Sequence, residues 1–480
     1  MSIYSNYETV IGIEVHTELS TNTKAFCSCT TKFGGEENTH CCPVCVGMPG
    51  AMPVLNEKVV EYGVRAGLAT NCSINKYSYQ DRKNYFYPDL AKGYQVTQDK
   101  LPLCYDGHID IEVEDKIKRI GITRIHLEED TGKLTHDQDG SLIDYNRCGV
   151  PLIETVSEPD INSAQEARAY LETLRNIFIY IGVSDCKMNE GSFRTDVNIS
   201  VRKKGDKELG TRTEMKNLNS FSNVVKSIEA ETKRQIDLIE AGGEVIQETR
   251  RWDEASQTTV SMRTKGEAAD YRYFRDEDLR PVILEDQYIE NIGKSLPELA
   301  NAKKARYMEE YDLNDYDAGQ LVESQKIAKF FEDAVETCNN PKEVANWIMR
   351  EIFRLLDETE KEEAAIPFEA RLLGEMIKLI DAGTISNNIA KQVFEEMWKT
   401  GKNPEAIVEE KGLKQINDDD ALIEMAKEVL DSNEQSVKDY LGGNKRALKA
   451  LMGQMMKKTR GKANPQKVNE ILVNMLKEME

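Results

Sequence analysis

Four cysteines near the start of the chain have the spacing of a metal-binding site. Cys27 and Cys29 form a first pair, and Cys42 and Cys45 form a second pair with the two-residue spacing of a zinc knuckle. Four thiolates supply the tetrahedral ligand set of structural zinc, and such a closed site leaves no open position for catalysis. The spacing therefore predicts one structural Zn²⁺.

Two other side chains leave the choice of ligands open. His40 and Cys41 stand directly beside the second pair, but Cys42 is preferred because it forms the CxxC spacing. The alternative to a metal site is a group of free thiols left from a degenerate site. The chain is long and begins without a secretory signal, so its thiols are expected to be reduced rather than paired in disulfides.

Carboxylates and an imidazole form a second set of candidate ligands. Glu14 and His16 share the polar face of an alternating segment, residues 126–130 read HLEED, and Glu154 lies between apolar residues. Each of these alone is typical of a solvated side chain. Together they offer the carboxylate oxygens that Mg²⁺ prefers, although histidine is an unusual ligand for this cation. They therefore indicate a hard-cation site.

Residues 81–89, DRKNYFYPD, interleave aromatic and basic side chains. This pattern fits either an ordinary aromatic loop or a pocket that stacks a base and neutralises phosphate. Common nucleotide motifs are missing. No two glycines lie two positions apart, and the one Gly-Lys-Ser, at 293–295, has Tyr288 where a phosphate loop needs its first glycine. Any nucleotide is therefore expected to be bound in another way. The sequence also lacks HExxH and a Ser-rich amidase signature.

The elements that must position these residues are strands in the first part of the chain and helices in the rest. Alternation predicts strands at 10–19, 109–113, 119–127 and 196–201. A helix is expected from Ser163, which forms a capping box with Glu166, to Ile181, and another over 222–241. After a linker at 293–297, strand patterns give way to helical periodicity.

With 480 residues and 54.5 kDa, the chain is long enough for several hydrophobic cores. We expect an α+β fold with three parts: a strand-rich catalytic domain over 1–293, an all-helical domain over 294–405 and a small helical tail domain over 406–480. No apolar run approaches the ~18 residues of a membrane span, and the N-terminus has no targeting pattern. A cytoplasmic protein without a membrane partner is expected.

The net charge of −21 would repel nucleic acid if it were spread evenly. It is uneven, because the tail over 406–480 holds 13 basic and 13 acidic residues, and no acid occurs between 445 and 467. The pattern predicts a helix with a cationic outer face for nucleic-acid phosphates, and the alternative is a solvated face of no consequence. The basic residues of this run are Lys445, Arg446, Lys449, Lys457, Lys458, Arg460, Lys462 and Lys467.

Long motifs along the whole chain resemble one family, the B subunits of the tRNA-dependent aspartyl/glutamyl-tRNA amidotransferases. The matching segments are 9–19 (TVIGIEVHTEL), 81–89 (DRKNYFYPD), 121–130 (GITRIHLEED), 143–158 (IDYNRCGVPLIETVSE), 191–200 (GSFRTDVNIS), 214–221 (EMKNLNSF) and the tail motif 453–465 (GQMMKKTRGKANP).

The resemblance implies a cradle-shaped catalytic domain that uses ATP and Mg²⁺ to phosphorylate the side-chain carboxylate of Glu-tRNA(Gln) and/or Asp-tRNA(Asn). Ammonia then displaces the phosphate. The family's amidase (glutaminase) partner, the A subunit, releases the ammonia from glutamine, and a small C subunit joins the other two into a heterotrimer. The missing amidase signature agrees with this division of labour. The rival hypotheses are a non-catalytic scaffold that presents tRNA, and a free-standing zinc hydrolase, which the closed cysteine site disfavours.

The resemblance also implies site residues. Glu14, His16, Glu129 and Glu154 match the magnesium ligands of the kinase centre, which makes them the expected catalytic residues. Lys83 and Tyr85 match positions that line the pocket and channel. The charge pattern of the tail gives the expected tRNA contacts, which are Lys445, Arg446, Lys457, Lys458 and Arg460.

Strand alternation points to a different glutamate. Glu129 shares parity with Ile125 and Leu127, whereas Glu128 follows Arg124 and His126. Unless the strand ends or bulges near Leu127, Glu128 is the residue that faces polar surroundings.

Overall fold

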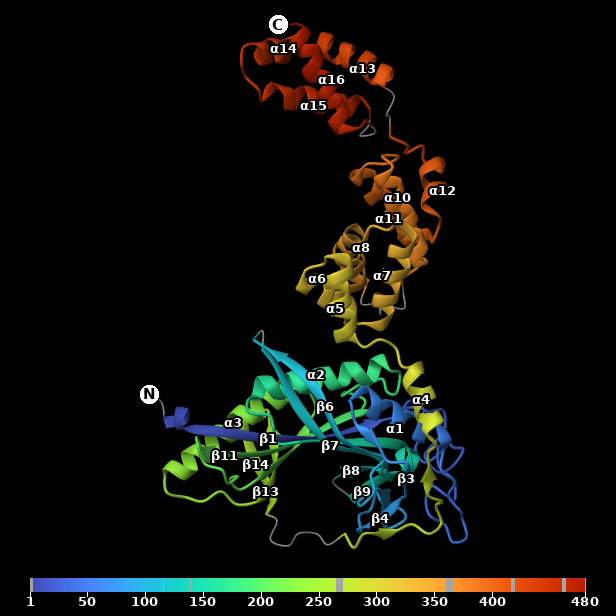
Figure 1. Ribbon diagram of the computed structural model, residues 1–480, viewed down its shortest axis with the longest axis vertical. Helices are drawn as coiled ribbons and strands as arrows, with labels where there is room; N and C mark the ends of the chain where they lie inside the picture. The colour runs from blue at the N-terminus through green and yellow to red at the C-terminus, as the bar shows by residue number, and fades with distance from the viewer. Residues whose placement is uncertain are drawn as a thin grey trace. The chain divides into compact units, whose positions relative to one another are not determined.

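The computed structural model describes residues 3–114, 116–137, 140–264, 271–359, 366–415, 419–459 and 463–479. It contains two compact units, Met1–Leu299 and Ala300–Glu480, and each is described by itself (Figure 1). Among these residues, no helix combines the length and the apolar character that crossing a membrane requires.

A nine-stranded sheet forms the centre of the first unit, in the order β14-β13-β12-β11-β1-β10-β7-β6-β2. Neighbouring strands are antiparallel except β12 and β13, which are parallel. β1, the first strand of the chain, therefore pairs with two strands that follow it by more than a hundred residues. The strands are β1 (Tyr7–Glu18), β2 (Ser73–Ile74), β6 (Cys104–Val113), β7 (Lys116–Glu129), β10 (Pro151–Ser157), β11 (Phe193–Lys203), β12 (Thr213–Leu218), β13 (Glu248–Asp253) and β14 (Thr258–Thr264).

Three small sheets complete the described strands of this unit, in the orders β15-β4-β5, β16-β3 and β8-β9. Two short 3₁₀ helices, η1 (Ile3–Asn6) and η2 (Tyr145–Arg147), precede β1 and β10. The strands are β3 (Tyr77–Ser78), β4 (Asp81–Asn84), β5 (Tyr94–Thr97), β8 (Lys133–Asp137), β9 (Gly140–Asp144), β15 (Phe274–Arg275) and β16 (Val282–Ile283).

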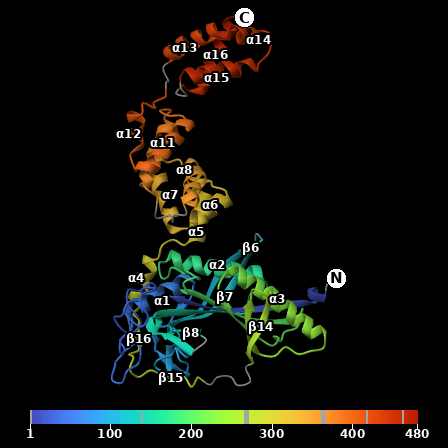
Figure 2. The same ribbon diagram turned by 180° about the vertical axis from the view of Figure 1, so that it is seen from behind.

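Helices cover one face of the large sheet, as both views show (Figures 1 and 2). They are α1 (Glu57–Ala69), α2 (Ala164–Tyr180) and α3 (Phe221–Glu240), and α4 (Asp286–Ser295) packs against the same core. Along β1, Ile11, Ile13 and Val15 are buried in this core. Because side chains alternate along a strand, Glu14 and His16 face the opposite side. The sequence prediction of these strands and helices is confirmed.

The expected cap of α2 is also present. The Oγ of Ser163 accepts a hydrogen bond of 3.1 Å from the backbone N–H of Glu166. The Glu166 carboxylate accepts from the N–H of Asn162 at 2.7 Å, one residue before the position that a capping box predicts.

The described part of the second unit is helical, so the α+β class is confirmed. It contains two separate apolar cores. Ile407 and Val408 of α12 belong to the first of these cores, although the sequence boundary at 405 assigns them to the tail; the three-part division itself stays a prediction. The first core involves α5 (Ala300–Tyr311), α6 (Asp315–Val322), α7 (Gln325–Cys338), α8 (Pro341–Trp347), the π-helical η3 (Ile348–Ile352), α9 (Phe353–Thr359), α10 (Ala370–Asp381), α11 (Asn387–Thr400) and α12 (Pro404–Glu410), and the second involves α13 (Asp419–Ser432), α14 (Glu434–Leu441), α15 (Ala447–Lys458) and α16 (Pro465–Glu478).

Candidate functional site

A polar cavity of about 510 Å³ lies on the face of the large sheet that the helices leave uncovered. Its walls combine carboxylates, imidazoles, lysines, arginines and tyrosines, so it is suited to a charged ligand rather than an apolar one. The lining residues include Glu14, His16, Lys83, Tyr85, Gln95, Thr97, Arg124, His126, Glu128, Asp130, Glu154, Arg194, Asp196, Glu214, Lys216, Tyr271 and Tyr273.

Sheet register brings a first group of candidate ligands together in this cavity. Glu154 on β10 lies directly opposite His16 on β1 and opposite His126 on β7. His16, Glu128 and Glu154 each offer one ligand atom, and these atoms lie within 4.8 Å of one another. The Oε2 atom of Glu154 is 3.4 Å from Nε2 of His16. The three side chains can therefore hold one cation.

Contacts between the histidines and the carboxylates of this group favour the charged forms of both, although burial opposes these forms. Burial disfavours the imidazolium form of His16, but the hydrogen bond and the charge of Glu154 raise its pKa to about 9. Burial likewise opposes the carboxylate form of Glu154, yet the charge of His126 and the bonds from both histidines hold its pKa well below its usual range. Without a cation, the imidazoles thus balance the carboxylates.

A second group of carboxylates lies in the same cavity. Glu14, Asp196 and Glu214 also offer oxygens within 4.8 Å of one another, and Glu14 pairs with Asp196 across β1 and β11. Lys216 bridges the group, because its Nζ donates to Asp196 and lies 3.2 Å from Oε1 of Glu214. Burial and the nearby charges of Glu154 and Asp196 raise the pKa of Glu14. An additional cation would relieve this accumulation of negative charge.

The structure places Glu128, and not the expected Glu129, in the cavity. β7 continues to residue 129 and its register with β10 is unbroken from Arg124 to that residue, so Glu129 lies on the same face as Leu127. Its carboxylate accepts hydrogen bonds from Lys92 Nζ and from the N–H of Val96, the latter at 2.8 Å. The strand alternation, which points to Glu128, therefore agrees with the lining of the cavity, and the metal ligand itself stays a prediction.

Glu128 is fixed by two donors from the neighbouring β5. Gln95 Nε2 donates to one carboxylate oxygen of Glu128, and Thr97 Oγ donates to the other at 3.1 Å. Gln95 also donates to the backbone carbonyl of Glu129 at 2.7 Å. These bonds hold the end of β7 in place and leave Glu128 4% exposed.

Lys83 and Tyr85 both line the cavity, as the sequence predicts. The Nζ of Lys83 lies 5.1 Å from the centre of the Tyr271 ring, and Tyr271 meets Tyr85 edge to face. Burial opposes the charge of Lys83, but Glu128 and Tyr273 raise its pKa above the ordinary value. A permanently charged lysine beside the carboxylates can stabilise negative charge on a bound substrate.

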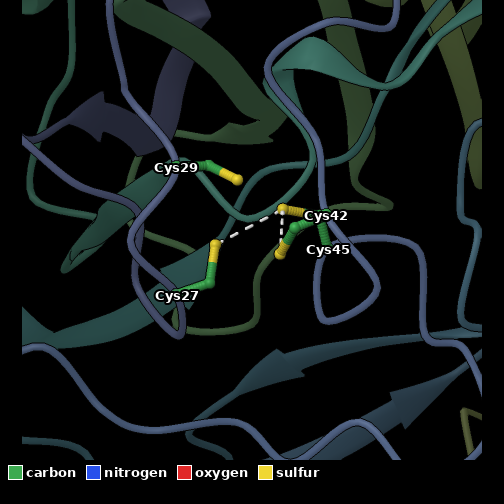
Figure 3. A group of neighbouring side chains, drawn as sticks. All are labelled: Cys27, Cys29, Cys42 and Cys45. Atoms are coloured by element: carbon green, nitrogen blue, oxygen red, sulfur yellow. Dashed lines mark hydrogen bonds between the residues drawn. The ribbon is translucent and has the colours of Figure 1, made fainter.

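The four predicted cysteines converge in the segment between β1 and α1, which forms no helix or longer strand. Figure 3 shows their sulfur atoms facing one another. The Sγ of Cys45 lies 3.4 Å from that of Cys27 and 3.7 Å from that of Cys42, and all four ligand atoms lie within 4.8 Å. A tetrahedral Zn²⁺ with bonds of about 2.3 Å separates its sulfurs by about 3.8 Å. The cluster thus has the dimensions of a zinc site.

The neighbouring candidates lie outside this cluster. The thiol of Cys41 donates to the carbonyl of Asn38 at 3.2 Å, and His40 is linked to Lys24 through its backbone carbonyl, 2.6 Å from the Lys24 Nζ. Lys24 is fully buried and also lies 3.6 Å from the Sγ of Cys45. Donation from the Cys27 thiol lowers the pKa of Cys45 to about 4. At least one sulfur is therefore ready to bind a metal as a thiolate.

The basic residues of the tail lie on the surface of the second unit's smaller core. Leu451 and Met455 of α15 are buried in that core. The cationic side chains lie on the exposed side, as expected for an amphipathic helix, although Lys458 pairs with Glu428. Arg460 and Lys462 lie outside the described residues. The exposed basic residues are Lys445, Arg446, Lys449, Lys457 and Lys458.

Sequence reasoning missed several cavity residues. Asp196, Glu214 and Lys216 stand in conspicuous motifs, but the motifs alone single out none of the three. Alternation along residues 196–201 was a usable signal, since it separates Asp196 from the buried Val197. The partnership of Asp196 with Glu214 depends on the strand order, which the sequence does not reveal.

Comparison with known proteins identifies relatives over nearly the whole chain. The family described as "GatB/GatE catalytic domain" matches residues 9–290, and that described as "GatB domain" matches 329–476. The B subunit of the aspartyl/glutamyl-tRNA(Asn/Gln) amidotransferase of Caldicellulosiruptor saccharolyticus is 61% identical over 97% of this chain and 98% of its own. The B subunits of the same name from Thermoanaerobacter pseudethanolicus and Clostridium tetani are 58% and 54% identical, each over 97% of this chain and 98% of their own.

Proposed function

Because the chain belongs to the family of aspartyl/glutamyl-tRNA(Asn/Gln) amidotransferase B subunits, we propose that it converts misacylated Glu-tRNA(Gln) and/or Asp-tRNA(Asn) to the correct amide in an ATP-dependent reaction. The side-chain carboxylate is first phosphorylated, since oxide is a poor leaving group, and ammonia then displaces the phosphate. The observation that carries this proposal is the convergence of His16, Glu128 and Glu154 in a polar cavity.

The cavity residues have distinct tasks in this reaction. His16, Glu128 and Glu154 would hold one Mg²⁺, and Glu14, Asp196 and Glu214 are suited to a second cation. Bound Mg²⁺ neutralises phosphate charge during phosphoryl transfer. Lys83 and Lys216 line the same cavity and would stabilise a phosphorylated carboxylate bound there, and the tyrosines around Lys83 would restrict access of water to it.

The cysteine cluster has a structural task. Cys27, Cys29, Cys42 and Cys45 would bind one Zn²⁺ with all four positions filled by protein sulfur. Such a site supplies no open position for a substrate, which disfavours a zinc hydrolase. It fixes the irregular segment that leads from β1 to α1 instead.

The proposal also requires partners. The relatives are named as B subunits, so they belong to an enzyme of several subunits. Ammonia would come from an amidase A subunit, joined to this chain with a small C subunit in a heterotrimer. The exposed basic residues from Lys445 to Lys458 would bind tRNA phosphates. Their contacts are expected to follow backbone and shape, because A-form RNA hides its major groove.

One experiment separates this function from the alternative of a non-catalytic scaffold. Hydrolysis of ATP that depends on Glu-tRNA(Gln) is measured in the reconstituted complex with Glu154→Gln and with Glu158→Gln, an exposed control on the same segment. We expect loss of tRNA-dependent hydrolysis only in Glu154→Gln, with tRNA binding retained in both. Unchanged hydrolysis in Glu154→Gln would favour the scaffold.

A further inference from the structure

The buried His126 faces the cavity but has no task in the proposed reaction. Its side chain is 3% exposed, in contrast to that of His16, which is 22% exposed. Its Nε2 atom lies 3.2 Å from Oε2 of Glu154 and 3.3 Å from Oε2 of Glu128. One ring nitrogen therefore contacts both carboxylates of the first ligand group.

The register of the sheet explains this arrangement. His16, Glu154 and His126 stand opposite one another on β1, β10 and β7, so Glu154 lies between two imidazoles. Glu128 follows His126 by two residues and shares its face. His126 is therefore the one side chain of this row that reaches both carboxylates from the deeper, less exposed side of the cavity.

The other ring nitrogen identifies His126 as a donor rather than a ligand. Among the described residues, Nδ1 of His126 is buried and has no hydrogen-bond partner. If the proton were on Nδ1 alone, a buried N–H would have no hydrogen-bond partner. In addition, the unprotonated Nε2 would direct its lone pair at two carboxylates and be repelled by them. The proton therefore belongs on Nε2, and a protonated nitrogen has no lone pair to offer to a cation.

We propose that His126 is a positioning residue that holds Glu128 and Glu154 as ligands for a divalent cation bound with His16. This inference rests on the metal centre of the proposed function. Without the Nε2 donor, two buried carboxylates would repel each other and lose their common orientation. Removal of such a supporting residue typically lowers metal affinity by about 10- to 100-fold.

The test compares amides that imitate one ring nitrogen each. In His126→Gln the amide N–H lies near the position of Nε2, whereas in His126→Asn it lies near that of Nδ1. Mn²⁺ is titrated into the purified full-length chain, and melting temperatures monitor folding. We expect His126→Asn and His126→Leu to bind Mn²⁺ about 10- to 100-fold more weakly than the unchanged protein, and His126→Gln to stay within about threefold. The exposed His136→Asn serves as control and should be neutral.

If the Gln and Asn variants bind Mn²⁺ equally well, or if His126→Leu binds it as tightly as the unchanged chain, the positioning role of His126 is wrong. The metal centre itself would still stand in that case. Absence of Mn²⁺ binding to the unchanged chain would overturn the metal centre and this role with it. Electron spin-echo modulation separates ligand from donor: the ¹⁴N coupling of bound Mn²⁺ should survive in His126→Gln and disappear in His16→Gln, and the reverse result contradicts the proposal.

A measurement without mutation completes the test. In the chain labelled with ¹⁵N-histidine, the nitrogen shifts of His126 should report a proton on Nε2. A bare Nε2 would overturn the proposal whether or not any variant folds.

Discussion

The cavity and the cysteine cluster are positioned by different kinds of structure. The cavity ligands His16, Glu128 and Glu154 come from three adjacent strands whose register brings them together. The four cysteines lie in an irregular segment with only one isolated bridge, between Thr23 and Thr30. The sheet can hold its ligands without a cation, whereas the irregular segment depends on its metal for a fixed shape. Loss of metal from the cavity should therefore abolish activity and leave the fold intact, whereas loss of metal from the cysteine cluster should loosen the local fold and affect activity less.

The largest effect is expected from the cavity. Glu154→Gln removes the carboxylate that two imidazoles face, so tRNA-dependent ATP hydrolysis should fall by about 1,000-fold or more. The melting temperature should change little by comparison, because the sheet rather than the cation maintains the site. Turnover and thermal unfolding of the same preparation measure both. Unfolding of the variant under assay conditions would contradict the idea that the cavity keeps its shape without a bound cation.

The cysteine cluster should behave in the opposite way. Cys45→Ser removes one of four zinc ligands, on the order of 3 kcal/mol of binding free energy, and should weaken zinc retention against a chelator by about 100-fold. Limited proteolysis should then become faster at residues 30–41. Activity per folded molecule should fall far less than in Glu154→Gln. Cys41→Ser is the matched control, because this thiol bonds to Asn38 outside the cluster; equal zinc loss in both variants would refute the assignment.

A third comparison contrasts two adjacent residues. Glu128→Gln should weaken Mn²⁺ binding by about 10- to 100-fold, since it changes a cavity carboxylate. Glu129→Gln should stay within about threefold, because its carboxylate is bound to Lys92 and Val96 outside the cavity. Calorimetric titration of both variants measures the difference. The reverse order would show that the family match, and not the strand register, identifies the ligand.

The smallest effect is expected in the tail, where function would depend on exposed charge alone. Replacing Lys445, Arg446 and Lys449 together by Ala should weaken tRNA binding by about tenfold and make the slope of log affinity against log salt less negative by about 2. Lys477→Ala, an exposed lysine outside the basic run, is the control. Filter binding at several salt concentrations provides both quantities. An unchanged slope in the triple variant would mean that these basic residues are only solvated and do not contact tRNA phosphates.

The sequence was informative wherever the relevant pattern is local. Alternation located β1 and β7, a capping pair located the start of α2, and cysteine spacing located the cluster, because each depends on residues a few positions apart. Parity along β7 also predicted that Glu128, rather than Glu129, faces the polar cavity. The grouping of Glu14 with Asp196 and Glu214 was not available, since it depends on strand order across about 200 residues of chain. The donor role of His126 likewise requires the register of β7 with β10.

The position of β1 between β10 and β11 also has a consequence for synthesis on the ribosome. Tyr7–Glu18 leaves the exit tunnel early, but its partners are Pro151–Ser157 and Phe193–Lys203. At a synthesis rate of roughly 5–20 residues per second, the second partner follows about 10–40 s later. Until Pro151–Ser157 follows, this segment rich in Val and Ile has neither partner, and until Phe193–Lys203 follows it still lacks one; unpaired strand edges are the condition under which nascent chains aggregate or recruit chaperones. Production of the folded protein should therefore respond more strongly to the speed of translation over the codons for residues 7–203 than over those that follow.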